Sequence, residues 1–241
     1  MSDQLSEILQ RVRADLSDSA DPVARQSEQR FFKEGVQVYG MKTAVANAIA
    51  KSCLKEIRAG GLSKAAVFWL CEQLWASGYL EEALVACVLS ESQHKRSEPA
   101  DFEVFEGWVR RHVTNWATCD TLCNHTVGDL LMLFPELAER LLDWTGADNR
   151  WVRRAAAVSL IVPARRGLFH ELVLRIADAL LIDSDDMVRK GYGWMLKAAA
   201  DHDQNLVFEY VMRHKDVMPR TALRYAIEKM PPALKSQAMA R

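Results

Sequence analysis

The stretch Asp-Asn-Arg-Trp-Val-Arg-Arg-Ala at residues 148–155 and a similar stretch, Asp-Asp-Met-Val-Arg-Lys-Gly-Tyr at residues 185–192, decide the fold. Each places an acidic or amide side chain suited to cap a helix ahead of an apolar residue, a basic pair and a small residue. Two such helix starts, with helix pairs recurring about every 35–40 residues, match tandem two-helix arrays such as HEAT-like repeats. These arrays stack pair upon pair into a curved solenoid.

The rest of the chain is helical in pattern. Glycine and proline are sparse among the 241 residues, and apolar residues recur three and four apart. We therefore predict an all-α fold, a single-domain solenoid of tandem HEAT-like two-helix repeats over residues 1–241. The predicted helices cover residues 3–17, about 22–35, 41–57, 63–76, 79–91, 101–113, 115–133, 136–145, 149–162, 167–181, 185–200, 203–214 and 219–229.

Charge is unevenly distributed along the chain. Residues 1–149 carry 15 Lys and Arg against 22 Asp and Glu, whereas residues 150–241 carry 16 against 10, so the two parts are near -7 and +6 although the whole chain is at -1. The split permits a basic surface for a polyanion in the C-terminal half. It is equally compatible with two parts that neutralise each other.

The five cysteines lie inside apolar helical patterns and form no Cys-x-x-Cys, which is typical of reduced thiols in a helical core. Cys119, Cys123 and His125 come nearest to a metal cluster, but no matching second pair accompanies them, so we expect no metal. The N-terminus lacks a basic region followed by an apolar run, and no uncharged apolar stretch is long enough for a bilayer. We expect a cytoplasmic protein without membrane contact.

The stretch Asn-Trp-Ala-Thr-Cys-Asp at residues 115–120 is the first candidate for a site. Asn115 is a suitable N-cap, and Trp116 and Asp120 are four residues apart, which places both on one face of a helix. An aromatic ring beside a carboxylate suits a ligand that is apolar on one side and cationic on the other. Taken alone, a buried Trp and a solvated Asp are the more ordinary interpretation.

Four segments together resemble the DNA alkylation-repair family of HEAT-like-repeat alkylpurine DNA glycosylases of the AlkD type. They are the Phe-Phe-Lys and Tyr-Gly region at 31–40, Asn-Trp-Ala-Thr-Cys-Asp at 115–120, Asn-Arg-Trp-Val-Arg-Arg-Ala-Ala at 149–156 and Lys-Gly-Tyr-Gly-Trp-Met-Leu-Lys at 190–197. Their order and spacing cover most of the chain. The resemblance implies a monofunctional glycosylase that removes N3- and N7-alkylated purines from duplex DNA without metal or organic cofactor.

By this resemblance, Trp116 and Trp194 are the two active-site tryptophans, Asp120 is the catalytic carboxylate and Arg154 belongs to the same cleft. An N3- or N7-alkylated purine is already cationic, so the enzyme need not protonate the leaving base. An ionised Asp120 would stabilise the oxocarbenium-like sugar and orient the attacking water. The two indole faces would pack against the deoxyribose, and Arg154 would bind a phosphate or keep Asp120 charged.

Basic residues near the two similar helix starts are the expected DNA contacts on a concave face. They are Arg153, Arg154, Arg189, Lys190 and Lys197. On charge alone, pairing of these residues with local acids such as Asp148, Asp185 and Asp186 is equally plausible.

Two further interpretations stay open beside a DNA glycosylase that acts as a monomer. One is a non-catalytic HEAT-like-repeat module that binds DNA or protein, and the other is a protein scaffold without nucleic acid. The loop His-Lys-Arg-Ser-Glu-Pro at 94–99 is either a DNA-contacting edge or a solvated linker. The Gly191-x-Gly193 pair has no strand before it, so it predicts close helix packing behind Trp194 rather than a nucleotide loop.

Overall fold

The structure is a computed structural model that describes residues 2–240. Over this range every regular element is a helix, and one isolated β-bridge joins Gln37 to Tyr79. The chain divides into two compact units, the first ending at Thr121 and the second beginning at Leu122. The all-α prediction is confirmed, whereas the single domain over residues 1–241 stays a prediction.

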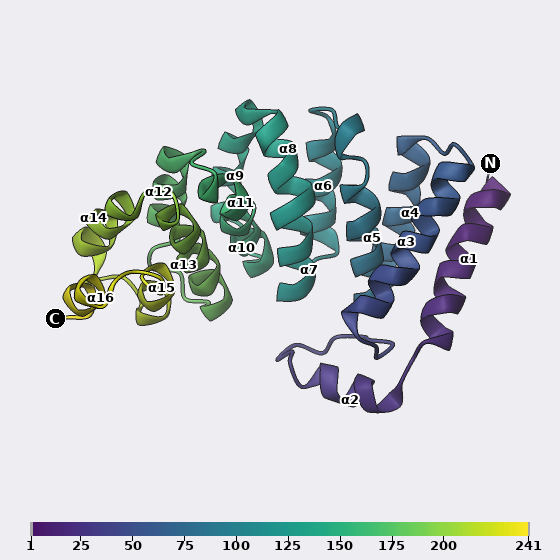
Figure 1. Cartoon of the computed structure of the whole chain (residues 1–241), viewed down its shortest axis with the longest axis horizontal. Helices are drawn as coiled ribbons and strands as arrows, with labels where there is room; N and C mark the ends of the chain where they lie inside the picture. The colour runs from purple at the N-terminus through teal and green to yellow at the C-terminus, as the bar shows by residue number, and fades with distance from the viewer. Residues whose placement is uncertain (1, 241) are drawn as a thin grey trace. The chain divides into compact units, whose positions relative to one another are not determined.

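The first unit has two layers of helices. Helix α3 contacts α5, and α5 contacts α7, so these three form one row, while Phe68 of α4 meets Trp108 of α6 edge to face in the other. Figure 1 shows this row, with α2 beneath its lower end. The elements are α1 (Ser2–Asp18), α2 (Pro22–Gln29), α3 (Thr43–Ala59), α4 (Lys64–Ala76), α5 (Leu80–Glu91), the short 3-10 helix η1 (His94–Arg96), α6 (Asp101–Arg111) and α7 (Trp116–Thr121).

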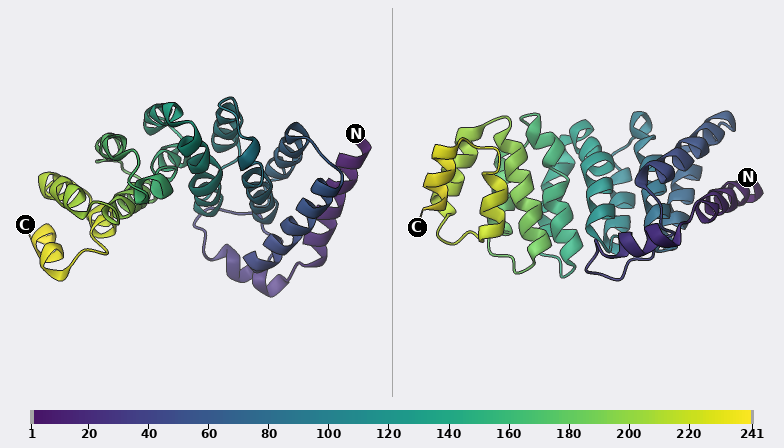
Figure 2. Two further views of the ribbon diagram at one scale, coloured as in Figure 1. Left: turned by 45° about the horizontal axis from the view of Figure 1, so that its top comes forward. Right: turned by 60° about the horizontal axis from the view of Figure 1, so that its bottom comes forward.

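The second unit repeats this plan. Helix α13 contacts α10 on one side and α15 on the other, and α9 with α12 and α14 with α16 form contacts in the second layer. The green and yellow helices in Figure 2 show the repeated pairs. The elements are the π-helical segment η2 (Leu122–Val127), α8 (Gly128–Leu133), the 3-10 helix η3 (Pro135–Arg140), α9 (Leu141–Thr145), α10 (Arg150–Val158), α11 (Ile161–Arg165), α12 (His170–Ala179), α13 (Asp186–Ala200), α14 (Gln204–His214), α15 (Arg220–Ala226) and α16 (Pro232–Met239).

Most of the predicted helices are present, but four boundaries were wrong. The second helix ends at Gln29 instead of near Gly35, and the predicted helix over residues 115–133 changes to π-helical geometry from Leu122 to Val127. The predicted helix over 149–162 ends at Val158 and α11 follows, while much of the predicted helix over 136–145 is 3-10. Helix α16 was missed because the Pro231-Pro232 pair reads as a breaker, although Pro is favourable in a first helical turn.

Most tryptophans lie in the core. Trp75, Trp108, Trp144 and Trp151 are indeed buried, whereas Trp69 is 40% exposed. All five cysteines are buried, and none of them forms a disulfide. Burial raises the pKa of the Cys53 thiol to about 12, which keeps this group protonated and unreactive at neutral pH.

None of the helices in residues 2–240 combines the length and the apolar character required to cross a membrane.

Helix α13 lies unusually close to its two neighbours because of two glycines. A Cβ at Gly191 would sit 3.2 Å from Cγ of Arg154 in α10. A Cβ at Gly193 would sit 2.7 Å from Cβ of Tyr225 and 2.8 Å from the carbonyl oxygen of Ala222, both in α15. The predicted role of this glycine pair in close helix packing is therefore confirmed.

Replacement of Gly193 by Ala should destabilise the protein, since the carbonyl of Ala222 and the Cβ of Tyr225 must both move. Overpacking of this kind costs about 1–3 kcal/mol, and urea unfolding measures it. Gly146→Ala is the matched control, because nothing lies within 4 Å of its Cβ position. Equal unfolding midpoints for the two variants would contradict the packing role of Gly193.

Candidate active site and nucleic-acid interface

Helix α7 presents Trp116 and Asp120 as the sequence predicts. The Asn115 side chain caps this helix by accepting a hydrogen bond from the Thr118 backbone N–H at 3.0 Å, which confirms its predicted role. Trp116 is 37% exposed and Asp120 is half-buried, whereas Cys119 is fully buried. The four-residue spacing therefore keeps the indole and the carboxylate on the accessible side of α7.

The Trp116 ring has an aromatic partner. Phe32 stacks on it with ring centroids 5.5 Å apart and an interplanar angle of 22°. Phe32 also packs against the buried cluster of Val36, Val38 and Leu80. Because Phe32 is held by this small core, it gives one face of the Trp116 indole a fixed support and leaves part of the ring accessible.

Two carboxylates at the start of α5 hold the loop that carries Phe32. Glu81 accepts hydrogen bonds from the backbone N–H groups of Tyr39 at 3.0 Å and Gly40 at 2.8 Å. Glu82 accepts from the Tyr39 hydroxyl at 2.8 Å and pairs with Arg13 at 3.0 Å. Both carboxylates are buried, and charge-assisted bonds of this type are stronger than neutral ones.

Gly40 allows this loop to lie against α2. Its φ of +92° suits glycine, and a Cβ there would approach the backbone nitrogen of Arg25 to 2.5 Å. The loop thus passes between α2 and the start of α5 in a geometry that other residues would strain.

A third carboxylate in this region, that of Glu28, is incompletely hydrogen-bonded. Glu28 of α2 has one buried carboxylate oxygen without a hydrogen-bond partner among the described residues. Burial and the nearby charge of Glu81 raise the Glu28 pKa, against the opposing effect of a hydrogen bond with the Met41 backbone. The folded state therefore disfavours the charged form of Glu28.

In the second unit, the Arg154 side chain packs against α13, the helix that carries Trp194. Arg154 is only 4% exposed, and its Nη1 donates to the carbonyl of Met187 in α13. Its side chain lies over Gly191, one helical turn before the half-buried Trp194 on the same side of α13. Close packing at Gly191 thus sets the guanidinium near this face of α13.

The remaining basic candidates of the second unit have partners within the unit. Arg153 pairs with Asp183 at 2.6 Å and donates to the carbonyls of Ala147 and Asp148 at 2.8 Å. Arg189 likewise donates to the carbonyl of Asp183 at 2.6 Å. Lys190 pairs with Asp186 at 2.7 Å and Lys197 with Glu228 at 2.8 Å. These contacts favour the local pairing that the sequence left as an alternative.

The two similar sequence stretches have one local geometry. Asn149 caps α10 by accepting from the Trp151 N–H at 2.9 Å, and Asp185 caps α13 by accepting from the Met187 N–H at 2.8 Å. In each case the Arg four residues after the cap reaches back to the carbonyl two residues before it. The basic residue at this repeat position therefore fastens the loop that enters the helix.

The charge asymmetry is also smaller in the structure than in the sequence halves. Residues 1–121 carry 14 Lys and Arg against 17 Asp and Glu, and residues 122–241 carry 17 against 15, which gives -3 and +2. The division at residue 149 had assigned several acids of η3 and α9 to the first half. Net charge alone does not locate a polyanion surface in the second unit.

The sequence singles out the candidate site residues but not the residues that support them. The predicted helix over about 22–35 included Phe32, whereas Phe32 lies beyond α2 and stacks on Trp116. Glu81 and Glu82 were not singled out, because acids in a first helical turn are ordinarily solvated partners of the helix dipole. Their only signal in the sequence is an adjacent pair inside an apolar helix.

The described part of the chain contains no candidate metal site. Among residues 2–240, no three His, Cys, Asp or Glu side chains are grouped so that they could hold a metal ion.

An all-α repeat fold with a capped helix that presents Trp and Asp on one face defines a class of helical-repeat proteins. Residues 12–230 match the family model described as DNA alkylation repair enzyme. A solved structure, described as a predicted DNA alkylation repair enzyme from Enterococcus faecalis, has a similar fold with a TM-score of 0.79 at 18% identity, covering 89% of this chain and 98% of that one. A search of curated proteins gave no match.

The chain therefore belongs to the DNA alkylation repair enzyme family. Family membership implies repair of alkylated DNA, so DNA is the partner.

Replacement by Gln should change the free energy of unfolding in opposite directions at Glu28 and Glu81, the two carboxylates compared around the Phe32 loop. Glu28→Gln should raise the free energy of unfolding at pH 7 by on the order of 1 kcal/mol or less, since the carboxylate is partly solvated. Glu81→Gln should lower it by about 1.5–3 kcal/mol because two backbone donors lose a charged acceptor. Urea unfolding measures both.

The Glu28 effect should depend on pH. Its folded-state pKa lies above the ordinary value of 4.5, so ionisation costs stability at higher pH. The gain from Gln should therefore fade as the pH falls through the folded-state pKa and should be absent below 4.5. The exposed Glu7→Gln is the control for charge removal. Destabilisation by Glu28→Gln at pH 7 would contradict this account.

Proposed function

We propose that the protein is a monofunctional DNA glycosylase that hydrolyses the N-glycosidic bond of cationic N3- or N7-alkylated purines in duplex DNA. The observation that carries the proposal is the pair of Trp116 and Asp120 on the accessible side of a capped helix, in a chain of the DNA alkylation repair family. By the family resemblance, Trp194 and Arg154 are proposed as further site residues, and they lie on contacting helices of the second unit.

Asp120 supplies the chemical contribution. Alkylation places a positive charge on the purine, so the base leaves as a neutral molecule and needs no general acid. As the bond to C1′ breaks, positive charge moves to the sugar. A carboxylate fixed beside C1′ stabilises that charge and accepts a hydrogen bond from the attacking water. No metal or organic cofactor takes part in this scheme.

The two indoles act on the same charge. The faces of Trp116 and Trp194 pack against the deoxyribose and favour its cationic form, by about 0.5–2 kcal/mol depending on desolvation. The stacked Phe32 keeps the Trp116 ring in place, so little conformational entropy is lost when the sugar binds.

Among the basic candidates, burial separates two roles. Arg154, which is nearly inaccessible and bonded to the Met187 carbonyl, contributes its charge to the cleft. Lys190 belongs to a half-exposed pair within one helix, and such pairs contribute at most about 1 kcal/mol, so it can exchange Asp186 for a phosphate at low cost. Arg153 must give up several local bonds to contact DNA. Arg189 must give up its bond to the Asp183 carbonyl, and Lys197 its pair with Glu228.

Loss of the Asp120 charge should abolish most base release. In Asp120→Asn, which preserves shape, release of 7-methylguanine and 3-methyladenine from methylated duplex DNA should fall by about 10²–10³-fold, the usual cost of removing one electrostatic stabiliser. Binding to the same DNA should persist. Single-turnover release of free base measures the rate, and the exposed Asp216→Asn is the matched control.

The outcomes separate the two functions that the fold allows. Equal release by the wild type and Asp120→Asn would remove this carboxylate from the mechanism. DNA binding without release by the wild type would leave a non-catalytic DNA-binding module, and absence of both would leave a protein scaffold.

Phe32 should act as a positioning residue through Trp116. Phe32→Ala should lower the single-turnover rate by about 3- to 10-fold, since stacked aromatic pairs contribute about 0.5–1.5 kcal/mol beyond their buried area. Phe32→Tyr should restore the rate. In a Trp116→Ala background the Phe32→Ala change should have no further effect, and additive losses would show that Phe32 does not work through the indole.

A further inference from the structure

We infer that the first unit contains a separate groove that binds the sugar-phosphate backbone of duplex DNA away from the lesion. The groove comprises two adjoining cavities of 480 and 530 Å³ between the C-terminal parts of α3 and α5 and the loop that contains η1. The cavities share Leu54, Arg58, Glu91 and Ser92, so they form one continuous depression. This inference rests on the proposed function in that the chain acts on duplex DNA.

The groove is rich in uncompensated positive charge. Lys51, Lys55 and Arg58 of α3 and Lys95 of η1 line it and are all exposed. None of these four side chains takes part in an ion pair or side-chain hydrogen bond within residues 2–240. The single carboxylate in the lining is that of Glu91.

Cations on the other α-helices of the first unit have partners, whereas Arg30, Lys33 and Lys42, which lie between these helices, form no ion pair within residues 2–240. Arg13 pairs with Glu82 and Lys64 with Asp101, and Arg110 and Arg111 of α6 face Glu106 and Glu72. Pairing is thus common in this unit, and the groove is a place where it does not occur. A cluster of unpaired cations around one depression repels itself unless an anion binds.

The helix dipole explains only part of this cluster. Arg58 lies in the last turn of α3, where a cation stabilises the negative end of the helix. Lys51 and Lys55 lie one to two turns earlier, beyond the reach of that effect. Their spacing of four and three residues along the chain places all three cations in a stripe on one side of α3.

The stripe has the length of a short run of phosphates. Seven residues of helix, from Lys51 to Arg58, rise about 10 Å. Phosphates of one DNA strand follow each other at about 3.4 Å along the duplex axis, so a run of about four phosphates spans a similar length. The apolar floor at Leu54 and Val88 suits the sugars between them.

The opposite wall of the groove is fixed. Arg96 donates to the carbonyl of Leu62 at 3.3 Å, and Lys64 donates to the carbonyl of Arg96 at 3.1 Å while pairing with Asp101 at 2.9 Å. These bonds hold Lys95 at the edge of the depression. The loop at residues 94–99, which the sequence left open, is thereby assigned to the DNA-contacting edge.

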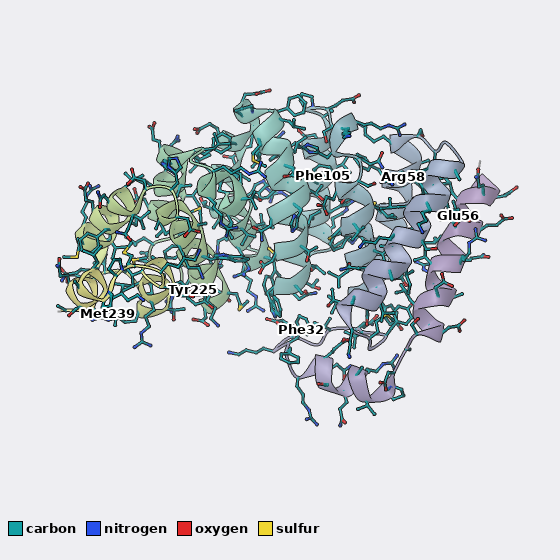
Figure 3. All side chains as sticks on the ribbon, in the orientation of Figure 1. Phe32, Glu56, Arg58, Phe105, Tyr225 and Met239 are labelled. Carbon is teal, nitrogen blue, oxygen red and sulfur yellow. The ribbon has the colours of Figure 1, made fainter. Side chains whose placement is uncertain are left out.

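The groove lies apart from the Trp116 region. Helix α5 begins at Leu80, in the cluster that supports Phe32, and ends at Glu91 in the groove, which is about 18 Å of helix. Figure 3 labels Arg58 and Phe32 at opposite ends of the first unit's helices. A duplex held at Trp116 would therefore meet the groove several base pairs from the damaged nucleotide.

The test is the salt dependence of binding to an undamaged duplex. Lys51→Gln/Lys55→Gln should reduce the slope of log affinity against log salt by about 1.8, because each phosphate contact contributes about 0.9. Lys51→Arg/Lys55→Arg should restore the wild-type slope. Arg213→Gln/Lys235→Gln, which removes the same charge from α14 and α16, should leave the slope unchanged.

Other outcomes would overturn the inference. Equal slope changes in the two Gln variants would show general electrostatic attraction only. A loss of affinity for a poly-glutamate peptide of matched charge, with DNA binding unchanged, would make the groove a site for an acidic protein. Groove-dependent DNA binding by a protein that releases no base would sustain this inference while refuting the glycosylase, and base release with an unchanged slope would do the reverse.

Discussion

The stacking of Phe32 on Trp116 depends on two carboxylates that are buried at the start of α5. Glu81 binds the backbone of the Tyr39-Gly40 turn, and Glu82 binds the Tyr39 hydroxyl. Burying carboxylates is costly unless donors surround them, and here the loop itself supplies the donors. The loop and the helix therefore stabilise each other. The polar bonds that hold the loop therefore also fix the orientation of the Trp116 indole, although they lie well away from the proposed chemistry.

In the second unit, basic residues at equivalent repeat positions stabilise the fold through local bonds. Arg153 and Arg189 occupy the same place in successive repeats, and each fastens the loop before its helix. The Arg153 guanidinium, which donates to the Asp183 carboxylate and to two backbone carbonyls, has few donors left for a phosphate. The free cations of the groove lie instead in the first unit, whose net charge is negative. Pairing, rather than net charge, decides which basic residues are available to a polyanion.

The sequence predicts the helices well where local signals agree. Caps such as Asn115, Asn149 and Asp185 perform as expected, and the Gly191-x-Gly193 pair brings α13 close to its neighbours. The predicted helix boundaries are wrong where tertiary contacts outweigh local sequence preferences. Residues 31–35 have a helical pattern, but Phe32 gains more by packing on Val36, Val38 and Trp116 than by extending α2. The π-helical turn after Thr121 leaves no mark in the apolar spacing.

The proposed chemistry explains why binding and catalysis would be assigned to different parts of one chain. A purine that is already cationic breaks its glycosidic bond readily, so a carboxylate and two aromatic faces are sufficient machinery, and little of the binding energy need come from contacts with the base. Such a site contributes little affinity by itself. Contacts with phosphates are independent of sequence and lesion, and they lengthen the time a duplex stays bound. A groove remote from Asp120 therefore lengthens the time the protein stays bound to DNA, which the few contacts of the active site do not provide. It does so without restricting which alkyl group the site accepts.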